Sequence, residues 1–273
     1  MQLKLVLLLI TVISNTLPVA AGPIPARPSP AALMQKSQAA QKNQVKFTKL
    51  PAGKAFALQQ SSLILGEYDV LINSLGVKAS CKRSGITFVA VPPLWNPVGY
   101  STFSKSIWKS QRANFSPIND TCKSLPMLGL PSIWLIPVEH SGQKVSSGFN
   151  CETFATTPAW SNEQAKSFKQ GLIQNTAPVS AKYEAANVGL PAPACQVLEK
   201  IFGTPSCSFL PIHFTFLKFN KNSSTGLETF SCHVVTPAKD WLDTPTNYKT
   251  VKTFGELNMD KGSQAGAEIL FGP

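Results

Sequence analysis

Short apolar runs bounded by turn residues recur in the second half of the chain and predict two β-hairpins. The first hairpin is expected to pair residues 133–136 with residues 147–153, and the second to pair residues 212–219 with residues 227–235. The polar turns between the strands read His-Ser-Gly-Gln-Lys and Asn-Lys-Asn-Ser-Ser-Thr-Gly. A further apolar run at residues 86–91 predicts a buried strand that ends at two consecutive prolines.

Helical spacing of apolar side chains predicts short helices between these strands. Helices are expected near residues 56–65 and at residues 101–112, 161–172 and 195–202. The third of them opens on Ser-Asn-Glu-Gln, which is typical of a capping box, and the fourth is followed by Gly203, a common helix stop. Helices mixed with hairpins in this way predict an α+β fold.

One motif occurs twice and indicates an internal duplication. Phe149-x-Cys151 and Phe230-x-Cys232 are each followed, after eight residues, by a tryptophan, and Thr-Pro-Ala lies inside both intervals. Duplication at this scale is typical of tandem units. We therefore expect two tandem, structurally similar repeats, each a β-hairpin-containing sheet with short helices, braced by disulfides.

The N-terminus has the pattern of a secretory signal. Lys4 precedes an apolar run too short to span a bilayer, and small residues then offer a cleavage site before Gly22. We expect a secreted chain without a membrane span. The expected boundaries are a signal peptide at residues 1–21, a disordered, Pro-rich, basic leader at residues 22–50, a first repeat at residues 51–160 with an insertion at about residues 92–120, and a second repeat at residues 161–273.

Six cysteines follow the predicted cleavage site, and an even number in a secreted chain favours disulfides. The preferred scheme, which closes one bond in each repeat and one between them, joins Cys122 to Cys151, Cys207 to Cys232, and Cys81 to Cys195. A bond between Cys195 and Cys207 would close as easily. The two-residue spacing of a zinc ribbon or a thioredoxin-like site does not occur, so neither is expected.

The chain is strongly basic. It carries 25 basic and 14 acidic residues, and removing the predicted signal takes away one lysine, which leaves a net charge of +10. Such a charge favours acidic partners and surfaces. The basic residues before Glu67 are interpreted as a solvated arm, and no nucleic-acid partner is expected.

A search for catalytic motifs finds little chemistry. The sequence has no Gly-x-Ser-x-Gly nucleophile turn and no His-Glu-x-x-His metal helix. His213 and His233 fall on the two strands of the second predicted hairpin. One hypothesis is therefore a metal site completed by Glu228 or Asp240, or a hydrolytic site that includes Asp240. Two structural histidines are the simpler interpretation. We therefore expect no cofactor, no metal and no enzymatic activity.

The predicted insertion carries the candidate contact surface, because added segments on a scaffold often acquire function. Within it Lys105, Lys109 and Arg112 recur at helical spacing, and Trp95 lies near its start. These four residues are the predicted partner-binding residues.

Two glycosylation sequons fall in predicted loops. Asn119-Asp-Thr and Asn222-Ser-Ser both have the required pattern, and a loop position would expose them. We expect Asn119 and Asn222 to be glycosylated in a secretory host.

The overall design resembles that of secreted effector proteins of plant-pathogenic, rust-type fungi. The shared features are the signal peptide, the Pro-rich leader, the modest number of cysteines, the small mature body and the lack of a catalytic motif. The resemblance implies a non-enzymatic virulence effector that binds a host protein, outside the cell or after translocation into it, and that a host immune receptor can recognise. The alternative is a secreted carbohydrate-binding protein or hydrolase with an unrecognised site. We expect a monomer.

Overall fold

The computed structural model describes residues 47–63, 65–117, 136–173 and 177–258. The predicted signal peptide, most of the predicted leader, Asn119 and Cys122 lie outside these residues. The strands are β1 (Ala55–Ser62), β2 (Gly66–Asn73), β3 (Gly76–Cys81), β4 (Ile86–Ala90), β5 (Val98–Ser101), β6 (Ser106–Lys109), β7 (Val138–Ser146), β8 (Phe149–Thr156), β9 (Pro178–Ala186), β10 (Leu210–Lys218), β11 (Ser223–Val235) and β12 (Lys249–Val251). The helices described in full are α3 (Pro158–Lys169), α4 (Ala192–Phe202) and α5 (Phe254–Asn258).

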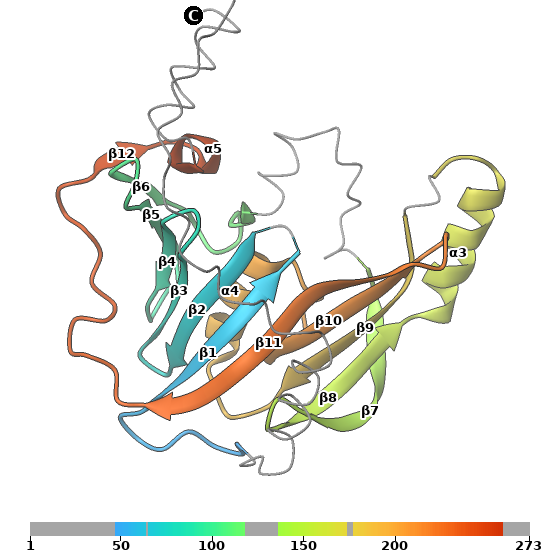
Figure 1. Ribbon diagram of the computed structural model, residues 1–273, viewed down its shortest axis with the longest axis horizontal. Coiled ribbons are helices and arrows are strands. Elements are labelled where there is room, and N and C mark those ends of the chain that lie inside the picture. Colours follow the sequence, from blue (N-terminus) through green and yellow to red (C-terminus); the bar gives the residue numbers. More distant parts are fainter. Residues whose placement is uncertain (1–46, 64, 118–135, 174–176, 259–273) are drawn as a thin grey trace, which may run out of the picture. The chain divides into compact units, whose positions relative to one another are not determined.

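These strands form one sheet of two meanders that meet in its middle. The order is β12-β6-β5-β4-β3-β2-β1-β11-β10-β9-β8-β7, and β12 alone among them pairs in parallel, with β6 (Figure 1). The antiparallel pair of β1 and β11, which we call the seam, joins the two meanders. Along the seam Ala55 lies opposite Val235, and Leu58 lies opposite Cys232.

The expected pair of tandem repeats is therefore wrong. The second predicted hairpin is found as β10–β11. The predicted turn at residues 140–144 lies instead within β7, which pairs with β8, and residues 133–135 lie outside the described residues. Both hairpins lie in one meander with β9 between them. The duplicated motif places Cys151 on β8 and Cys232 on β11, in the same sheet. An isolated hairpin is only marginally stable in water, and pairing within one larger sheet is the arrangement that this chain adopts.

Two of the predicted helices are strands. The predicted helix near residues 56–65 is β1, and that at residues 101–112 is the β5–β6 hairpin. In β6 the adjacent side chains of Ile107 and Trp108 enter different apolar clusters, because both faces of the sheet are covered there. Consecutive apolar residues in such a strand imitate helical spacing.

The main core lies between the sheet and α4, and we call this face of the sheet the inner face. Val197, Leu198 and Ile201 of α4 are fully buried, and the helix contacts β3 and β10, on either side of the seam. The predicted helix at residues 195–202 and the predicted strand at residues 86–91 are confirmed as α4 and β4. In Figure 1 α4 lies behind β1 and β2. None of the helices in the described ranges is long and apolar enough to cross a membrane.

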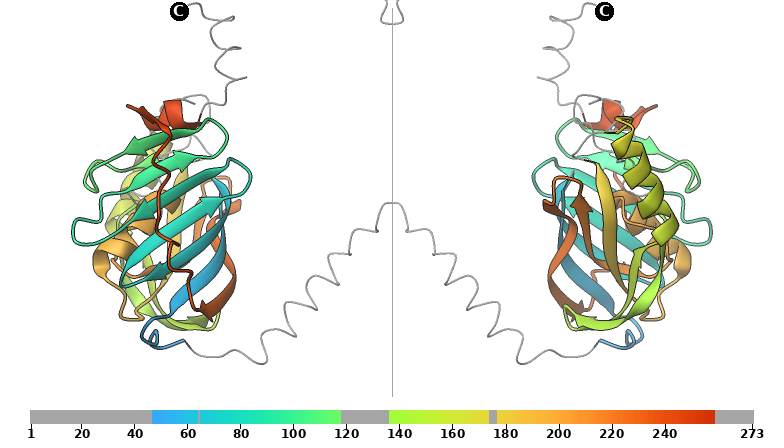
Figure 2. Two further views of the ribbon diagram at one scale, coloured as in Figure 1. Left: turned by 90° about the vertical axis from the view of Figure 1, so that its left-hand side faces the viewer. Right: turned by 90° about the vertical axis from the view of Figure 1, so that its right-hand side faces the viewer.

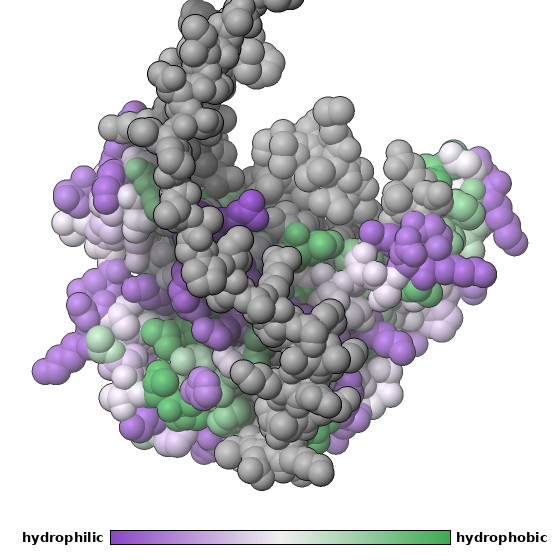
Figure 3. Space-filling model, in the orientation of Figure 1, coloured by the Kyte–Doolittle hydropathy of each residue, from purple (hydrophilic) through white to green (hydrophobic). Residues whose placement is uncertain are grey.

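The outer face is covered over β3 to β6 by the segment between β11 and β12. This segment, residues 236–248, is the orange thread that crosses the strands in the left view of Figure 2. Leu242 and Tyr248 pack there against Val89, Tyr100 and Ile107. On the side seen in Figure 1, Figure 3 shows a mixture of hydrophilic and hydrophobic residues where the surface is coloured.

The expected disulfides are wrong for the cysteines that the structure describes. Free thiols are found at Cys81, Cys151, Cys195, Cys207 and Cys232. Four of them lie on the sheet or on α4, and Cys207 lies between α4 and β10. Cys81 pairs with Tyr68 in the β2–β3 ladder, and Cys232 faces Leu58 across the seam. Buried cysteines of this kind act as small apolar side chains.

Candidate functional site

A projecting loop follows β4. Its residues 91–94, Val-Pro-Pro-Leu, are exposed, and we call them the apolar lip; Leu94 is 68% exposed. The next side chain, Trp95, is 5% exposed and belongs to the core. Trp95 has a φ of 56°, a left-handed conformation that costs free energy for a residue other than glycine. Burial of the indole offsets this cost, so Trp95 anchors the lip.

Beside the lip lies a hollow of about 450 Å³ that we call the basic groove. The projecting loop, the segment that follows β6 and one side of α4 surround it. Its lining residues are Leu94, Asn96, Gln111, Arg112, Ala113, Gln196 and Lys200. The groove therefore combines two apolar side chains, three amide side chains and two cations.

Hydrogen bonds hold the three walls of the groove together. Lys200 Nζ donates to the carbonyl oxygens of Arg112, at 2.6 Å, and Ala113, at 3.0 Å. The backbone N–H of Arg112 donates to Asn96 Oδ1 at 3.1 Å. Gln196 Nε2 donates to Ser208 Oγ at 2.9 Å. The groove is thus formed without a ligand.

The two cations of the groove lack a neutralising partner among the described residues. No ion pair there involves Arg112 or Lys200. Burial, and then repulsion from Arg112, lower the pKa of the Lys200 ammonium. The groove therefore concentrates positive charge beside an apolar surface.

The structure separates the four predicted contact residues. Arg112 lines the groove, and Trp95 anchors the lip beside it. Lys105 lies before β6, where its Nζ is 3.5 Å from the hydroxyl oxygen of Tyr248 and 5.4 Å from the centre of the ring. Lys109 is exposed at the other end of β6. The common helical face expected for the three basic residues does not exist, because the segment is a hairpin.

Sequence reasoning missed the wall of the groove that α4 contributes. Lys200 is 88 residues from Arg112 in the chain, so no local pattern connects them. A signal was nevertheless present, because Gln196 and Lys200 are four residues apart on the polar side of a helix whose other side is apolar.

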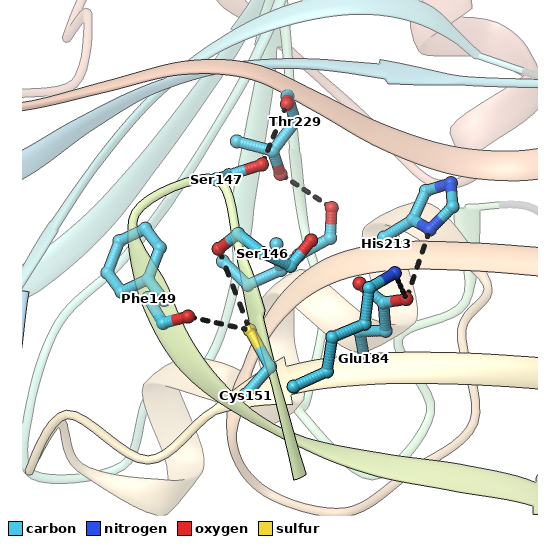
Figure 4. Close-up of polar contacts among 9 residues, drawn as sticks. Ser146, Ser147, Phe149, Cys151, Glu184, His213 and Thr229 are labelled. Carbon is cyan, nitrogen blue, oxygen red and sulfur yellow. Dashed lines mark hydrogen bonds and ion pairs between the residues drawn. The ribbon is translucent and has the colours of Figure 1, made fainter. Parts of the chain in front are cut away.

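A second polar cluster joins β7, β9 and β10 (Figure 4). Glu184 on β9 is 8% exposed, and its Oε1 lies 2.8 Å from Lys144 Nζ and 3.7 Å from His213 Nδ1. Burial alone would raise the pKa of Glu184. Favourable interactions with His213, Lys144 and Ser146 outweigh burial and lower this pKa to about 2, and the hydrogen bond from Lys144 Nζ is 2.8 Å long. The cluster thus holds a carboxylate that stays ionised and pins β7 to β9.

The nearby thiol of Cys151 is not suited to nucleophilic chemistry. Its Sγ lies 3.9 Å from the carbonyl oxygens of Ser146 and Phe149 (Figure 4). Burial, followed by repulsion from Glu184, raises the pKa of Cys151 to about 12. The group is therefore a neutral thiol near neutral pH, whereas the thiolate is the reactive form.

The hypothetical site of His213, His233 and Asp240 gains no support. His213 faces Glu228 in the β10–β11 ladder, whereas His233 faces Ala57 across the seam. Five residues separate Glu228 from His233, or about 15 Å along a strand. Within the described residues no three His, Cys, Asp or Glu side chains are placed to hold a metal.

A smaller hollow of about 220 Å³, the outer cleft, opens between β11, β1, β2 and β3. The register of the seam shifts between Gln59 and Gln60, so Phe230 has no partner on β1 and is 58% exposed. An ion pair of 2.8 Å joins Asp69 and Lys82. The lining residues are Gln59, Gln60, Glu67, Tyr68, Asp69, Lys82 and Phe230.

Comparisons with known proteins assign neither a family nor an activity. No family model and no curated protein matches the chain. An uncharacterized conserved protein from Thermus thermophilus aligns at 8% identity over 82% of this chain and 99% of its own, with a TM-score of 0.32. The Pseudomonas aeruginosa MucA/MucB complex aligns at 9% identity over 73% of this chain and 59% of the matched one, with a TM-score of 0.30. The Mycobacterium tuberculosis lipoprotein LppX aligns at 16% identity over 81% of this chain and 100% of its own, with a TM-score of 0.26. At TM-scores below 0.5 no argument about this chain rests on these similarities.

Proposed function

We propose that this chain is a secreted, non-catalytic binding protein that holds a partner protein at the apolar lip and the basic groove. The observation that carries the proposal is the exposure of Leu94 beside the core-anchored Trp95. A preformed apolar projection loses little conformational entropy when a partner covers it. Burying the leucine side chain would contribute about 1.5–3 kcal/mol to association.

The setting of this binding is also a proposal. The signal-like N-terminus and the lack of a catalytic motif support a virulence effector that binds a host protein. The neutral Cys151 thiol and the separation of His213 from His233 support a binding role over a hydrolytic one.

The test compares two equally exposed leucines. Wild-type protein, Leu94→Ser and Leu172→Ser are used to capture proteins from plant and fungal extracts; Leu172 is 71% exposed and lies outside the groove. A single partner should be captured by wild type and Leu172→Ser, and at least about tenfold less by Leu94→Ser. Equal capture by all three proteins, or no reproducible partner, would refute this use of the lip.

Carbohydrate binding is the second candidate, and the outer cleft favours it. An exposed aromatic ring beside amide, carboxylate and ammonium groups offers a sugar both an apolar face and hydrogen-bond partners. Retention on insoluble cell-wall polysaccharides should then be lost in Phe230→Ala. It should persist in Phe103→Ala, because Phe103 is 60% exposed but does not line the cleft. If wild-type protein is not retained, carbohydrate binding is excluded for the polysaccharides tested.

A further inference from the structure

We infer that the basic groove recognises a carboxylate side chain that stands next to an apolar residue on the partner protein. The inference rests on the proposed function, and it names the chemistry that the partner must present. Two features of the groove lead to it: a pair of unneutralised cations, and the exposed Leu94 at the edge of the same hollow.

The electrostatic part of the argument concerns the closeness of Arg112 and Lys200. Both line one hollow, and the charge of Arg112 disfavours the charged form of Lys200. No carboxylate among the described residues relieves this repulsion. An anion bound between the two cations would relieve it, so the groove favours a negatively charged ligand more than either cation alone would.

Hydrogen-bond donors in the groove match a carboxylate. Lys200 has three N–H donors and uses two of them on the carbonyl oxygens of Arg112 and Ala113, which leaves one for a ligand. The guanidinium of Arg112 can bind both oxygens of a carboxylate at once. The amides of Gln111 and Gln196 line the same groove and can add further donors.

Phosphate-rich partners fit the groove less well than an acidic protein surface. A nucleic-acid backbone is bound along a track of cations, whereas this groove has two. Lys105 stands apart, at the far end of β6, against Tyr248. The apolar lip instead favours an apolar side chain next to the acid. Glutamate or aspartate flanked by leucine satisfies both requirements.

The test uses short synthetic peptides, so it can be carried out before the partner is identified. The probe is the capped peptide Gly-Ser-Leu-Glu-Leu-Ser-Gly, and the matched probes are Gly-Ser-Leu-Gln-Leu-Ser-Gly and Gly-Ser-Ala-Glu-Ala-Ser-Gly. Amide NMR signals of the isotope-labelled protein are followed during millimolar additions. The Leu-Glu-Leu peptide should move the signals of Gln111, Arg112 and Gln196. The glutamine peptide should leave them in place, and the alanine peptide should bind more weakly.

Matched variants distinguish a specific contribution of the groove to peptide binding from a general effect of net charge. Arg112→Gln should weaken the Leu-Glu-Leu peptide about tenfold or more, since a hydrogen bond to a charged group is lost. Lys109→Gln removes the same charge from an exposed residue outside the groove and should change nothing. Equal responses to the glutamate and glutamine peptides, no response to any peptide, or an unaltered response in Arg112→Gln would overturn the inference.

The two proposals fail in different ways. If Leu94→Ser abolishes capture of a protein partner while Arg112→Gln leaves capture unchanged, the lip binds a protein but the groove does not bind a carboxylate of that protein. If the glutamate peptide binds as expected while Leu94→Ser captures the partner as well as wild type, the carboxylate site stands and the role of the lip is refuted.

Discussion

Lys200 Nζ donates a hydrogen bond of 2.6 Å to the carbonyl oxygen of Arg112, and so ties α4 to the segment that follows β6. The bond crosses from a helix in the second meander to a segment next to the first. It also places the ammonium group beside the guanidinium with which it shares the basic groove. A structural contact thus positions a charge that is available to a ligand.

Replacing Lys200 by methionine should loosen this connection. Two hydrogen bonds from a charged donor are lost, and the free energy of unfolding should fall by about 1–3 kcal/mol. Urea unfolding measures the loss, and hydrogen exchange should quicken at Arg112 and Ala113. Lys109→Met, at an exposed residue, serves as the control and should leave stability within about 0.5 kcal/mol of wild type. Equal effects of the two changes would contradict the role given to Lys200.

Trp95→Ala should be among the most destabilising changes in the projecting loop. The indole is 5% exposed within the core, and removal of a buried aromatic side chain costs about 3–5 kcal/mol. Thermal and urea unfolding measure this loss. Trp95→Phe keeps much of the apolar volume and should cost clearly less. A loss below about 1 kcal/mol for Trp95→Ala would show that the lip has another anchor.

Glu184 should stabilise the protein against mild acid. Its folded pKa, about 2, lies below the ordinary value of 4.5, so its contribution is complete above pH 4.5 and is lost as the pH falls toward 2. The contribution at neutral pH is on the order of 3 kcal/mol. Unfolding free energies of wild type and Glu184→Gln should therefore differ above pH 4.5 and converge near pH 2. A constant difference across this range would contradict the prediction.

Glu199 on α4 should give stability a pH dependence opposite to that given by Glu184. Burial raises its pKa above 4.5, although the backbone N–H groups of Cys207 and Ser208 donate to its Oε1. Its contribution to stability is therefore complete below pH 4.5 and is lost as the pH rises through the folded pKa. Glu199→Gln should remove this decline. Urea unfolding from pH 4.5 to neutrality tests the slope, and a variant whose slope matches wild type would disprove the assignment.

Asn222 should be glycosylated when the chain is made in a secretory host. The residue is exposed in the turn between β10 and β11, and its sequon is Asn-Ser-Ser. Mass spectrometry should show a glycan at this position that an amidase removes. Asn222→Gln should lack it and fold normally, since the side chain faces solvent. A wild-type chain that is exported without a glycan at Asn222 would contradict the expectation.

Much of the second meander was predictable because its strands carry local signals. The polar turn around Asn220 predicted the hairpin that is found as β10 and β11. The apolar run before Gly203 predicted the helix that is found as α4. Strand pairing between distant segments leaves no comparable trace. Nothing local near Leu58 or Cys232 reveals that the two residues face each other across the seam.

The wrongly predicted helix at residues 101–112 has one physical cause, which is burial from both sides. In β6 the neighbours Ile107 and Trp108 are both buried, so the alternation that marks a half-exposed strand is missing. The β5–β6 hairpin separates Lys105 from Arg112, and the packing of α4 brings Lys200 to the groove instead. Individual candidate site residues could therefore be predicted from local sequence. Which of them lie together in one site could not, because that depends on the tertiary fold.

The seam can form only late in the synthesis of the chain. Lys54 Nζ bonds Thr236 Oγ1 at 2.6 Å although the two residues are 182 positions apart in the chain, so this contact cannot form until nearly every strand has been synthesised. Pairings so remote in sequence are slow to form. During this delay β1 has β2 on one side and an open row of backbone donors and acceptors on the other. Such an open row is a strand edge to which a chaperone, or a neighbouring nascent chain, can pair.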